Sequence, residues 1–215
     1  MRAPYLHILR RARIRSASRS LVSAVANAVL FLGLALVGGV SSSLSMVDKG
    51  STLTTRTSGS WVMWLATGRP DADPYTRAHF ARQGGIPESS TVTQTWQARV
   101  DSDGQTLHSA CEYVVESESL EPGWWSMAVY DERGGLIPNP GERHAYNSQT
   151  IALDQHGGYI VTLARDARPL NWLPTGGAGR LALVLTRPAL KPGANAAETA
   201  ASLKTLPSIR RITCR

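Results

Sequence analysis

The sequence is poor in the residues and motifs from which an activity is usually inferred. It contains two cysteines, with no C-x-x-C pair and no spacing typical of a zinc site. The patterns G-x-S-x-G, H-E-x-x-H, S-x-x-K and the P-loop are all missing, which removes the simplest arguments for four common enzyme classes. At 215 residues the chain is also shorter than a barrel enzyme of about 250 residues. No specific reaction is indicated by the sequence.

Acidic residues are absent from the first 47 positions, so most of the net charge of +7 comes from the N-terminal segment. Six arginines lie in the first twenty residues, and the first acid is Asp48. From Asp48 onward there are 17 basic residues (23 less 6) and 16 acidic ones, a net of +1. The excess positive charge therefore belongs to a tail, and a nucleic-acid-binding domain is not expected.

The segment from Ser20 to Val47 contains no charged residue. Its apolar stretch, 21–42, is long enough to cross a bilayer as a helix, and the arginines before it predict a cytoplasmic N-terminus. We expect an Arg-rich tail (1–20), a transmembrane helix or signal anchor (21–42), a Ser/Thr-rich tether (43–58) and an exported domain (59–215). A cleaved signal peptide is the alternative, and it also exports the domain.

Both cysteines, Cys111 and Cys214, lie in the part expected to be exported. An even number of cysteines in an oxidising compartment favours one disulfide bond. The alternative is two free thiols, one of them buried.

The exported part is predicted to be mainly β. Runs of alternating polar and apolar residues flank Asp103-Gly104, so 91–100 and 106–115 are expected to pair as a hairpin. Further strands are predicted at 61–64, 124–131, 159–164, 180–186 and 209–214. Residues 53–57 lie in the predicted tether, but they could instead join the edge of a sheet. This pattern predicts an antiparallel, jelly-roll-like β-sandwich with one or two short helices.

Two helix starts can be recognised. Asp73 followed by Pro74 is a favourable N-cap and first position, and Gly84-Gly85 ends the segment. Asn195 and Glu198 have the spacing of a capping box. Asp73 could also contribute to a calcium site with Asp71, but capping explains it without a ligand.

Several motifs together resemble the bacterial family called domain of unknown function 1214, in its short, membrane-anchored form. The resemblance covers about 59–187 and is carried by Trp124–Asp131, Asn139-Pro140 with Arg143, Asn171–Pro174, Leu181–Leu185, and upstream Pro70–Arg77 and Cys111–Tyr113. It implies a jelly-roll-like β-sandwich and no established activity. The chain lacks the additional domain of larger relatives and departs from their last strand at Thr186-Arg187-Pro188.

A ligand site is expected where loops at one end of the sandwich bring polar and aromatic side chains together. Arg143 suits an anionic group, and an indole ring suits a sugar or an acyl chain. The alternative is structural: these side chains satisfy loop backbone and close the end of the sandwich. The candidates are Tyr130, Asp131, Asn139, Arg143, Asn171 and Trp172.

Trp124 and Trp125 are adjacent, so a strand would direct them to opposite faces. One can enter the core, and the other needs a helix, a partner or a ligand over it. Trp61 and Trp64 follow the predicted tether, and we expect them near the membrane surface.

The favoured hypothesis is a single-pass envelope protein of the bacterial inner membrane whose periplasmic domain binds a glycan, a lipid or another envelope protein. The alternative is an enzyme, with or without a divalent metal, whose Asp131, Arg143 and Asn171 meet in a pocket and act on a glycan or lipid. No metal site and no nucleic-acid partner are expected, and no cofactor can be assigned.

Overall fold

The computed structural model of the chain describes residues 5–84, 86–118, 123–190, 196–204 and 206–215. The chain divides into two compact units, Met1–Lys49 and Gly50–Arg215. Each unit is described by itself below.

The first unit is one continuous helix, α1 (Tyr5–Lys49). Within the described residues, one helical segment is long and apolar enough to cross a membrane, and it is Val22–Lys49 of α1. The predicted span 21–42 lies inside α1, but the helix continues through 43–49, which the composition predicts to be part of the tether. No proline or glycine interrupts this stretch. The helix ends before Gly50, whose φ of 72° is left-handed.

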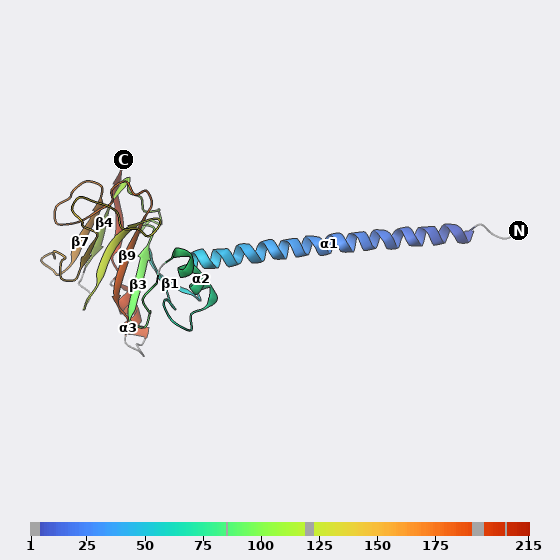
Figure 1. The fold of residues 1–215 in the computed structure, drawn as a ribbon, viewed down its shortest axis with the longest axis horizontal. Helices are drawn as coiled ribbons and strands as arrows, with labels where there is room; N and C mark the ends of the chain where they lie inside the picture. The colour runs from blue at the N-terminus through green and yellow to red at the C-terminus, as the bar shows by residue number, and fades with distance from the viewer. Residues whose placement is uncertain (1–4, 85, 119–122, 191–195, 205) are drawn as a thin grey trace. The chain divides into compact units, whose positions relative to one another are not determined.

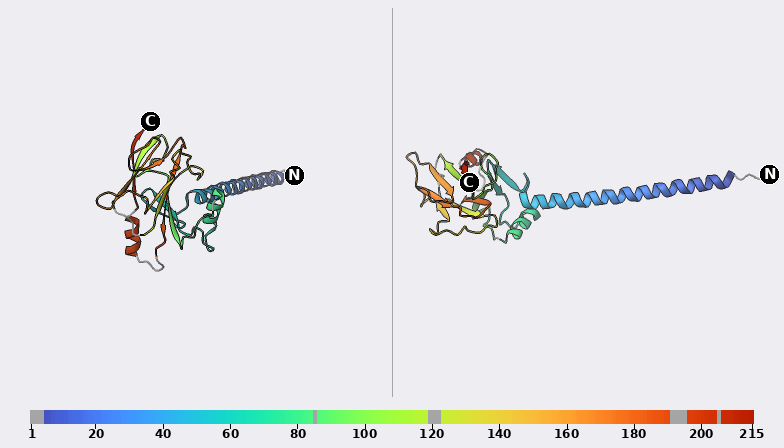
Figure 2. Two further views of the ribbon diagram at one scale, coloured as in Figure 1. Left: turned by 60° about the vertical axis from the view of Figure 1, so that its left-hand side comes forward. Right: turned by 90° about the horizontal axis from the view of Figure 1, so that it is seen from above.

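The second unit contains two β-sheets facing each other (Figures 1 and 2). The larger sheet has six strands and only antiparallel neighbours. Its order across the sheet is β1 (Thr55–Ser58), β2 (Trp61–Trp64), β3 (Thr93–Ala98), β9 (Leu181–Pro188), β5 (Ser126–Asp131) and β6 (Ala145–Asn147).

The smaller sheet has four strands, and its last pair, β7 with β8, is parallel. Its order is β10 (Ser208–Cys214), β4 (Cys111–Ser117), β7 (Tyr159–Ala164) and β8 (Asn171–Pro174). The predicted mainly β, jelly-roll-like sandwich with few helices is therefore confirmed, and the parallel pair is the departure from a purely antiparallel arrangement.

The core lies between the sheets and is rich in large aromatic side chains. Strand β3 shows how the sequence builds it, because Trp96 and Ala98 are buried while Thr95 between them is exposed. This alternation places every second residue on the inner face. Trp61, Tyr113 and Trp125 complete the aromatic part of the core.

The predicted hairpin around Asp103-Gly104 has the right turn and the wrong strand partners. The turn is held by the buried Asp101 carboxylate, which accepts hydrogen bonds from the backbone N–H groups of Asp103 and Gln105 at 3.1 and 2.8 Å. Beyond the bridge between Val100 and Thr106, however, the strands separate. β3 pairs with β2 and β9, and β4 pairs with β10 and β7, in the other sheet.

Helix α2 (Pro74–Gln83) begins and ends as predicted. The Asp73 side chain accepts hydrogen bonds from the backbone N–H groups of Tyr75 and Thr76, at 2.9 and 3.0 Å. Gly84, with a φ of 67°, closes the helix. In Figure 1, α2 lies on the side of the larger sheet that faces away from β4 and β7.

Helix α3 (Ala196–Lys204) occupies the second predicted helical segment. Asn195, the first residue of the proposed capping box, lies outside the described residues. The buried Arg187 of β9 fixes α3 by donating hydrogen bonds to the carbonyl and hydroxyl oxygens of Ser202 at 3.1 and 2.8 Å.

The segment assigned to a tether joins the fold instead. β1 pairs with β2 in register from Thr55 opposite Trp64 to Ser58 opposite Trp61, so the folded unit begins at Gly50 and not near Gly59. The two tryptophans expected near the membrane surface make contacts within the folded unit. Trp61 is 1% exposed and donates its indole N–H to the Pro207 carbonyl at 2.7 Å, while Trp64 packs against α2.

Candidate functional site

Tyr130 and Asp131 end strand β5, as the sequence suggested, but the Asp131 carboxylate serves its own turn. It accepts hydrogen bonds from the backbone N–H groups of Arg133 at 2.9 Å and Gly135 at 2.7 Å. This geometry holds the glycine turn that follows the strand. Asp131 therefore has a structural role in the loop.

Asn139 organises the following loop in the same way. Its amide nitrogen donates to the carbonyl oxygens of Ile137 at 3.1 Å and Arg143 at 3.0 Å, and its side-chain oxygen accepts from the Arg143 backbone N–H at 2.9 Å. The Arg143 guanidinium lies over the ring of Trp172, 5.8 Å from its centroid. These two predicted residues are thus brought together, as a cation–π pair.

Asn171 is buried and fixes a loop to strand β7. Its amide nitrogen donates to the carbonyls of Ala152 at 2.8 Å and Ile160 at 2.9 Å, and its oxygen accepts from the Ala152 N–H at 2.8 Å. Beside it, the backbone N–H of Trp172 donates to the Tyr146 hydroxyl at 3.1 Å, which connects edge strands of the two sheets.

The predicted loop-end pocket is therefore not assembled as expected. The polar atoms of Asp131, Asn139 and Asn171 are engaged with loop backbone, which corresponds to the structural alternative. No hydrogen bond or ion pair joins Asp131 to Arg143 or Asn171 in the described part of the chain.

A hollow of about 450 Å³ opens elsewhere, on the outer face of the larger sheet. Strands β2, β3, β9 and β5 form its floor, and α2 forms one wall. This volume is within the range of small-molecule pockets, roughly 300 to 1,000 Å³. We call this hollow the outer groove. Of the six predicted ligand-binding residues, Tyr130 alone lines it.

The floor of the outer groove carries hydroxyl side chains on three neighbouring strands. Thr95 of β3 is directly opposite Thr186 of β9, which is opposite Ser126 of β5. All three line the groove. Among the described residues, the structure gives none of these three hydroxyl groups a protein hydrogen-bond partner. Their hydrogen-bonding capacity faces the groove and solvent.

Aromatic side chains lie along the edges of the floor of the outer groove. Trp64 of β2 stacks on His79 of α2, with ring centroids 4.2 Å apart and planes 27° apart, and Phe80 meets Trp64 edge-on at 6.2 Å. Trp124, which is 48% exposed, lines the groove with Tyr130. The sequence predicts that one of the two adjacent tryptophans needs a cover or a ligand. Trp124 is that residue, because Trp125 is buried in the core. The period-two pattern of β3 could have identified Thr95, but the alignment with Thr186 and Ser126 is set by strand register.

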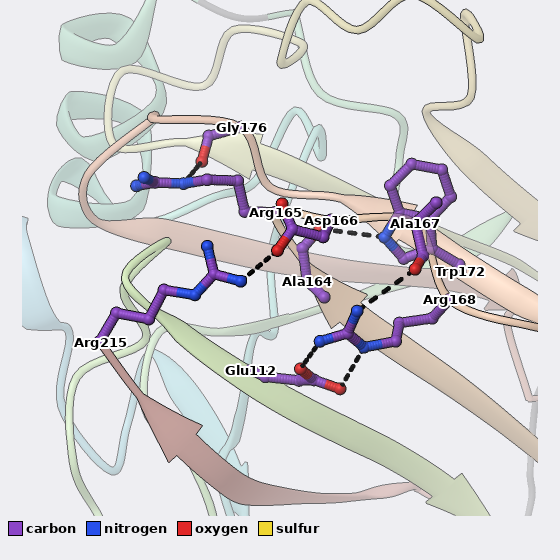
Figure 3. Close-up of polar contacts among 9 residues, drawn as sticks. All are labelled: Glu112, Ala164, Arg165, Asp166, Ala167, Arg168, Trp172, Gly176 and Arg215. Carbon is purple, nitrogen blue, oxygen red and sulfur yellow. Dashed lines mark hydrogen bonds and ion pairs between the residues drawn. The ribbon is translucent and has the colours of Figure 1, made fainter.

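A second hollow, of about 170 Å³, lies beside the disulfide bond that joins Cys111 to Cys214. Figure 3 shows its charged side chains. The Arg168 guanidinium meets the Glu112 carboxylate with two hydrogen bonds, 2.9 Å from Nε to Oε1 and 2.6 Å from Nη2 to Oε2. Arg215 pairs with Asp166. No sequence pattern indicated this group of charged residues, because its members come from distant segments.

These contacts lower the pKa of Glu112. The hydrogen bonds from Arg168 hold the pKa of the Glu112 carboxyl below its ordinary value, against the opposing effect of burial, and the charge of Arg168 lowers it further. The pKa of Arg168 is raised by the same pair. The cluster is internally paired and links β4 to the loop after β7.

No group of three or more His, Cys, Asp or Glu side chains among the described residues could hold a metal ion. The proposed calcium ligands have other roles: Asp73 caps α2, and Asp71 pairs with Arg69.

Known structures are similar to this fold. The VPA0106 protein from Vibrio parahaemolyticus, a crystal structure, aligns with 19% identity and a TM-score of 0.53, covering 85% of this chain and 45% of its own. An uncharacterised protein from Burkholderia cenocepacia aligns at 17% identity and a TM-score of 0.39, covering 57% of this chain and 30% of its own. The chain thus spans less than half the length of either protein.

No curated protein matches the sequence. The model of the family described as protein of unknown function DUF1214 matches residues 92–189, which run from the start of β3 to the end of β9. Residues 92–189 of this chain are therefore similar to the DUF1214 family.

Proposed function

We propose that the protein is a membrane-anchored binding module of the bacterial envelope that holds a ligand in the outer groove. The observation that carries this proposal is the row of hydroxyl groups from Thr95, Thr186 and Ser126 between aromatic walls. Side chains with open hydrogen-bonding capacity beside aromatic surface favour a ligand that is partly polar and partly apolar.

Helix α1 is the proposed anchor. Its uncharged segment Val22–Val47 follows six arginines and precedes the folded unit. Under the positive-inside rule the N-terminus remains in the cytoplasm of an inner membrane, and the sandwich faces the periplasm. An oxidising periplasm is also consistent with the bond between Cys111 and Cys214.

Topology is tested in bacterial cells that produce the full chain with a C-terminal epitope. We expect the protein in the inner-membrane fraction, resistant to extraction by carbonate, and the epitope digested by protease only after the outer membrane is opened. A soluble, shortened chain would instead indicate a cleaved signal peptide, and an epitope protected in spheroplasts would contradict the orientation.

Ligand binding is tested by native mass spectrometry of the full chain released from detergent micelles. We expect a bound species on the wild type that is lost in Trp124→Ala. Ile160→Ala is the matched control, because Ile160 is 44% exposed against 48% for Trp124 but lies on β7 of the other sheet. Equal retention in both variants would place the ligand elsewhere.

A further inference from the structure

We infer that the ligand of the outer groove is a neutral glycan, an inference that rests on the binding function proposed above. Three features of the groove point to this class: the spacing of its hydroxyl groups, the nature of its walls and its small number of charges. They come from four strands and one helix of the same folded unit.

The hydroxyl groups are arranged for an extended polar ligand. Thr95, Thr186 and Ser126 are consecutive cross-strand neighbours, so their spacing follows the distance between strands. With strands about 4.8 Å apart, the row spans about 10 Å. A ligand lying across the strands therefore meets a hydroxyl group at regular intervals, and each hydroxyl can donate one hydrogen bond and accept others. The repeated hydroxyl groups of a short oligosaccharide match this pattern.

The walls suit the apolar faces of sugar rings. A pyranose ring carries C–H groups on its faces and hydroxyl groups at its rim, so it packs flat on an aromatic ring while its rim forms hydrogen bonds. Trp64 is held in place by its stack with His79, and Trp124 lines the groove from β5's side with nearly half of its surface exposed. A fixed aromatic surface loses little conformational entropy on binding.

The charges distinguish this ligand from the other classes. Among the described residues that line the groove, His79, Glu88 and Tyr130 are the ionisable ones, and there is no Arg or Lys. A phosphate or carboxylate ligand would therefore find no guanidinium or ammonium group to pair with. An acyl chain would leave the polar groups of Thr95, Gln97 and Thr186 facing hydrocarbon, which is unfavourable.

The test uses the full chain in nanodiscs and intrinsic tryptophan fluorescence. The probes are neutral oligosaccharides of glucose, mannose and N-acetylglucosamine, with oligogalacturonate as an acidic glycan and oleate as an acyl ligand. We expect at least one neutral oligosaccharide to bind, with an affinity that changes less than twofold between 0.05 and about 0.5 M salt, because no ion pair is involved.

Two substitutions link binding to the groove. Thr186→Val removes the central hydroxyl and keeps a β-branched shape, and we expect it to weaken binding about tenfold, since an unpaired sugar hydroxyl costs about this much. Thr162→Val, on β7 of the other sheet, is the matched control and is expected to leave affinity unchanged. Trp124→Ala is expected to abolish measurable binding.

The outcomes separate the two proposals. Oleate or oligogalacturonate binding that is lost in Trp124→Ala, without neutral-glycan binding, would overturn the glycan class and leave the groove as the site. Glycan binding that is unaffected by Thr186→Val and Trp124→Ala would overturn the assignment to this groove. No binding of any probe, together with no bound species in the native mass spectrum, would overturn both.

Discussion

The indole ring of Trp64 and the imidazole ring of His79 are stacked, with their centroids 4.2 Å apart. Trp64 ends strand β2 and His79 lies in the second turn of α2, so this stack joins the helix to the outer face of the larger sheet. Together with the edge contact between Trp64 and Phe80, the stack helps to hold one wall of the outer groove.

Removing this stack should loosen α2 locally. We expect His79→Ala to lower the local stability of the helix by about 1 kcal/mol, the usual contribution of an aromatic pair. Hydrogen exchange measured by mass spectrometry should then be several-fold faster in 74–83 and unchanged in the core strand β9. Uniform acceleration in both segments would contradict a local role for the stack.

The N-cap of α2 gives a prediction with a control two residues away. Asp73→Ala removes the acceptor for two backbone N–H groups and should destabilise the folded unit by about 1 kcal/mol. Asp71→Ala removes an exposed ion pair with Arg69 and should cost much less. Urea unfolding followed by tryptophan fluorescence compares the two variants, and an equal effect would contradict the capping role.

The Glu112 pair predicts a loss of stability in acid. The pKa of Glu112 is lower in the folded state than in the unfolded chain, because Arg168 donates hydrogen bonds to its carboxylate. The pair therefore stabilises the fold fully above the unfolded pKa, near 4.3, and this contribution is lost as the pH falls toward the folded pKa.

Glu112→Gln should remove part of that pH dependence, measured as the unfolding free energy between pH 3 and pH 7. We expect a loss of about 1 kcal/mol at pH 7 and a smaller difference from the wild type at pH 3. Glu116→Gln is the control on the same strand, because the nearest contact from Arg210 to Glu116 is 3.8 Å and both side chains are well exposed. A similar pH profile for both variants would show that the Arg168 pair has no special role.

The disulfide bond closes a long loop, since Cys111 and Cys214 are 103 residues apart. The chain-entropy argument gives a stabilisation of at most about 4 to 5 kcal/mol for a loop of this length. We expect the double variant Cys111→Ser/Cys214→Ser to unfold at a markedly lower urea concentration, and the wild type to show an intact mass two hydrogens below that of the reduced chain. A wild-type mass equal to the reduced mass would contradict the bond.

The sequence by itself determined the elements that depend on neighbouring residues. Asp73, Pro74 and Gly84 define α2 because caps and turns act over three or four positions. The uncharged stretch in α1 and the period-two strands are also local patterns. The first predicts the apolar helix, and the second predicts a mainly β domain. The turn at Asp101 was also local, although the strands it connects were not correctly paired.

Only the tertiary structure decided which strands meet. Gln97 lies opposite Val184, which is far along the chain, and no local signal specifies that partner. The same register brings Thr95, Thr186 and Ser126 into one row and so creates the floor of the outer groove. The sequence could not decide the role of Asp131, Asn139 and Asn171, because a loop asparagine or aspartate can bind either a ligand or nearby backbone. The folded loops satisfy the backbone, since an unpaired buried N–H or carbonyl is costly.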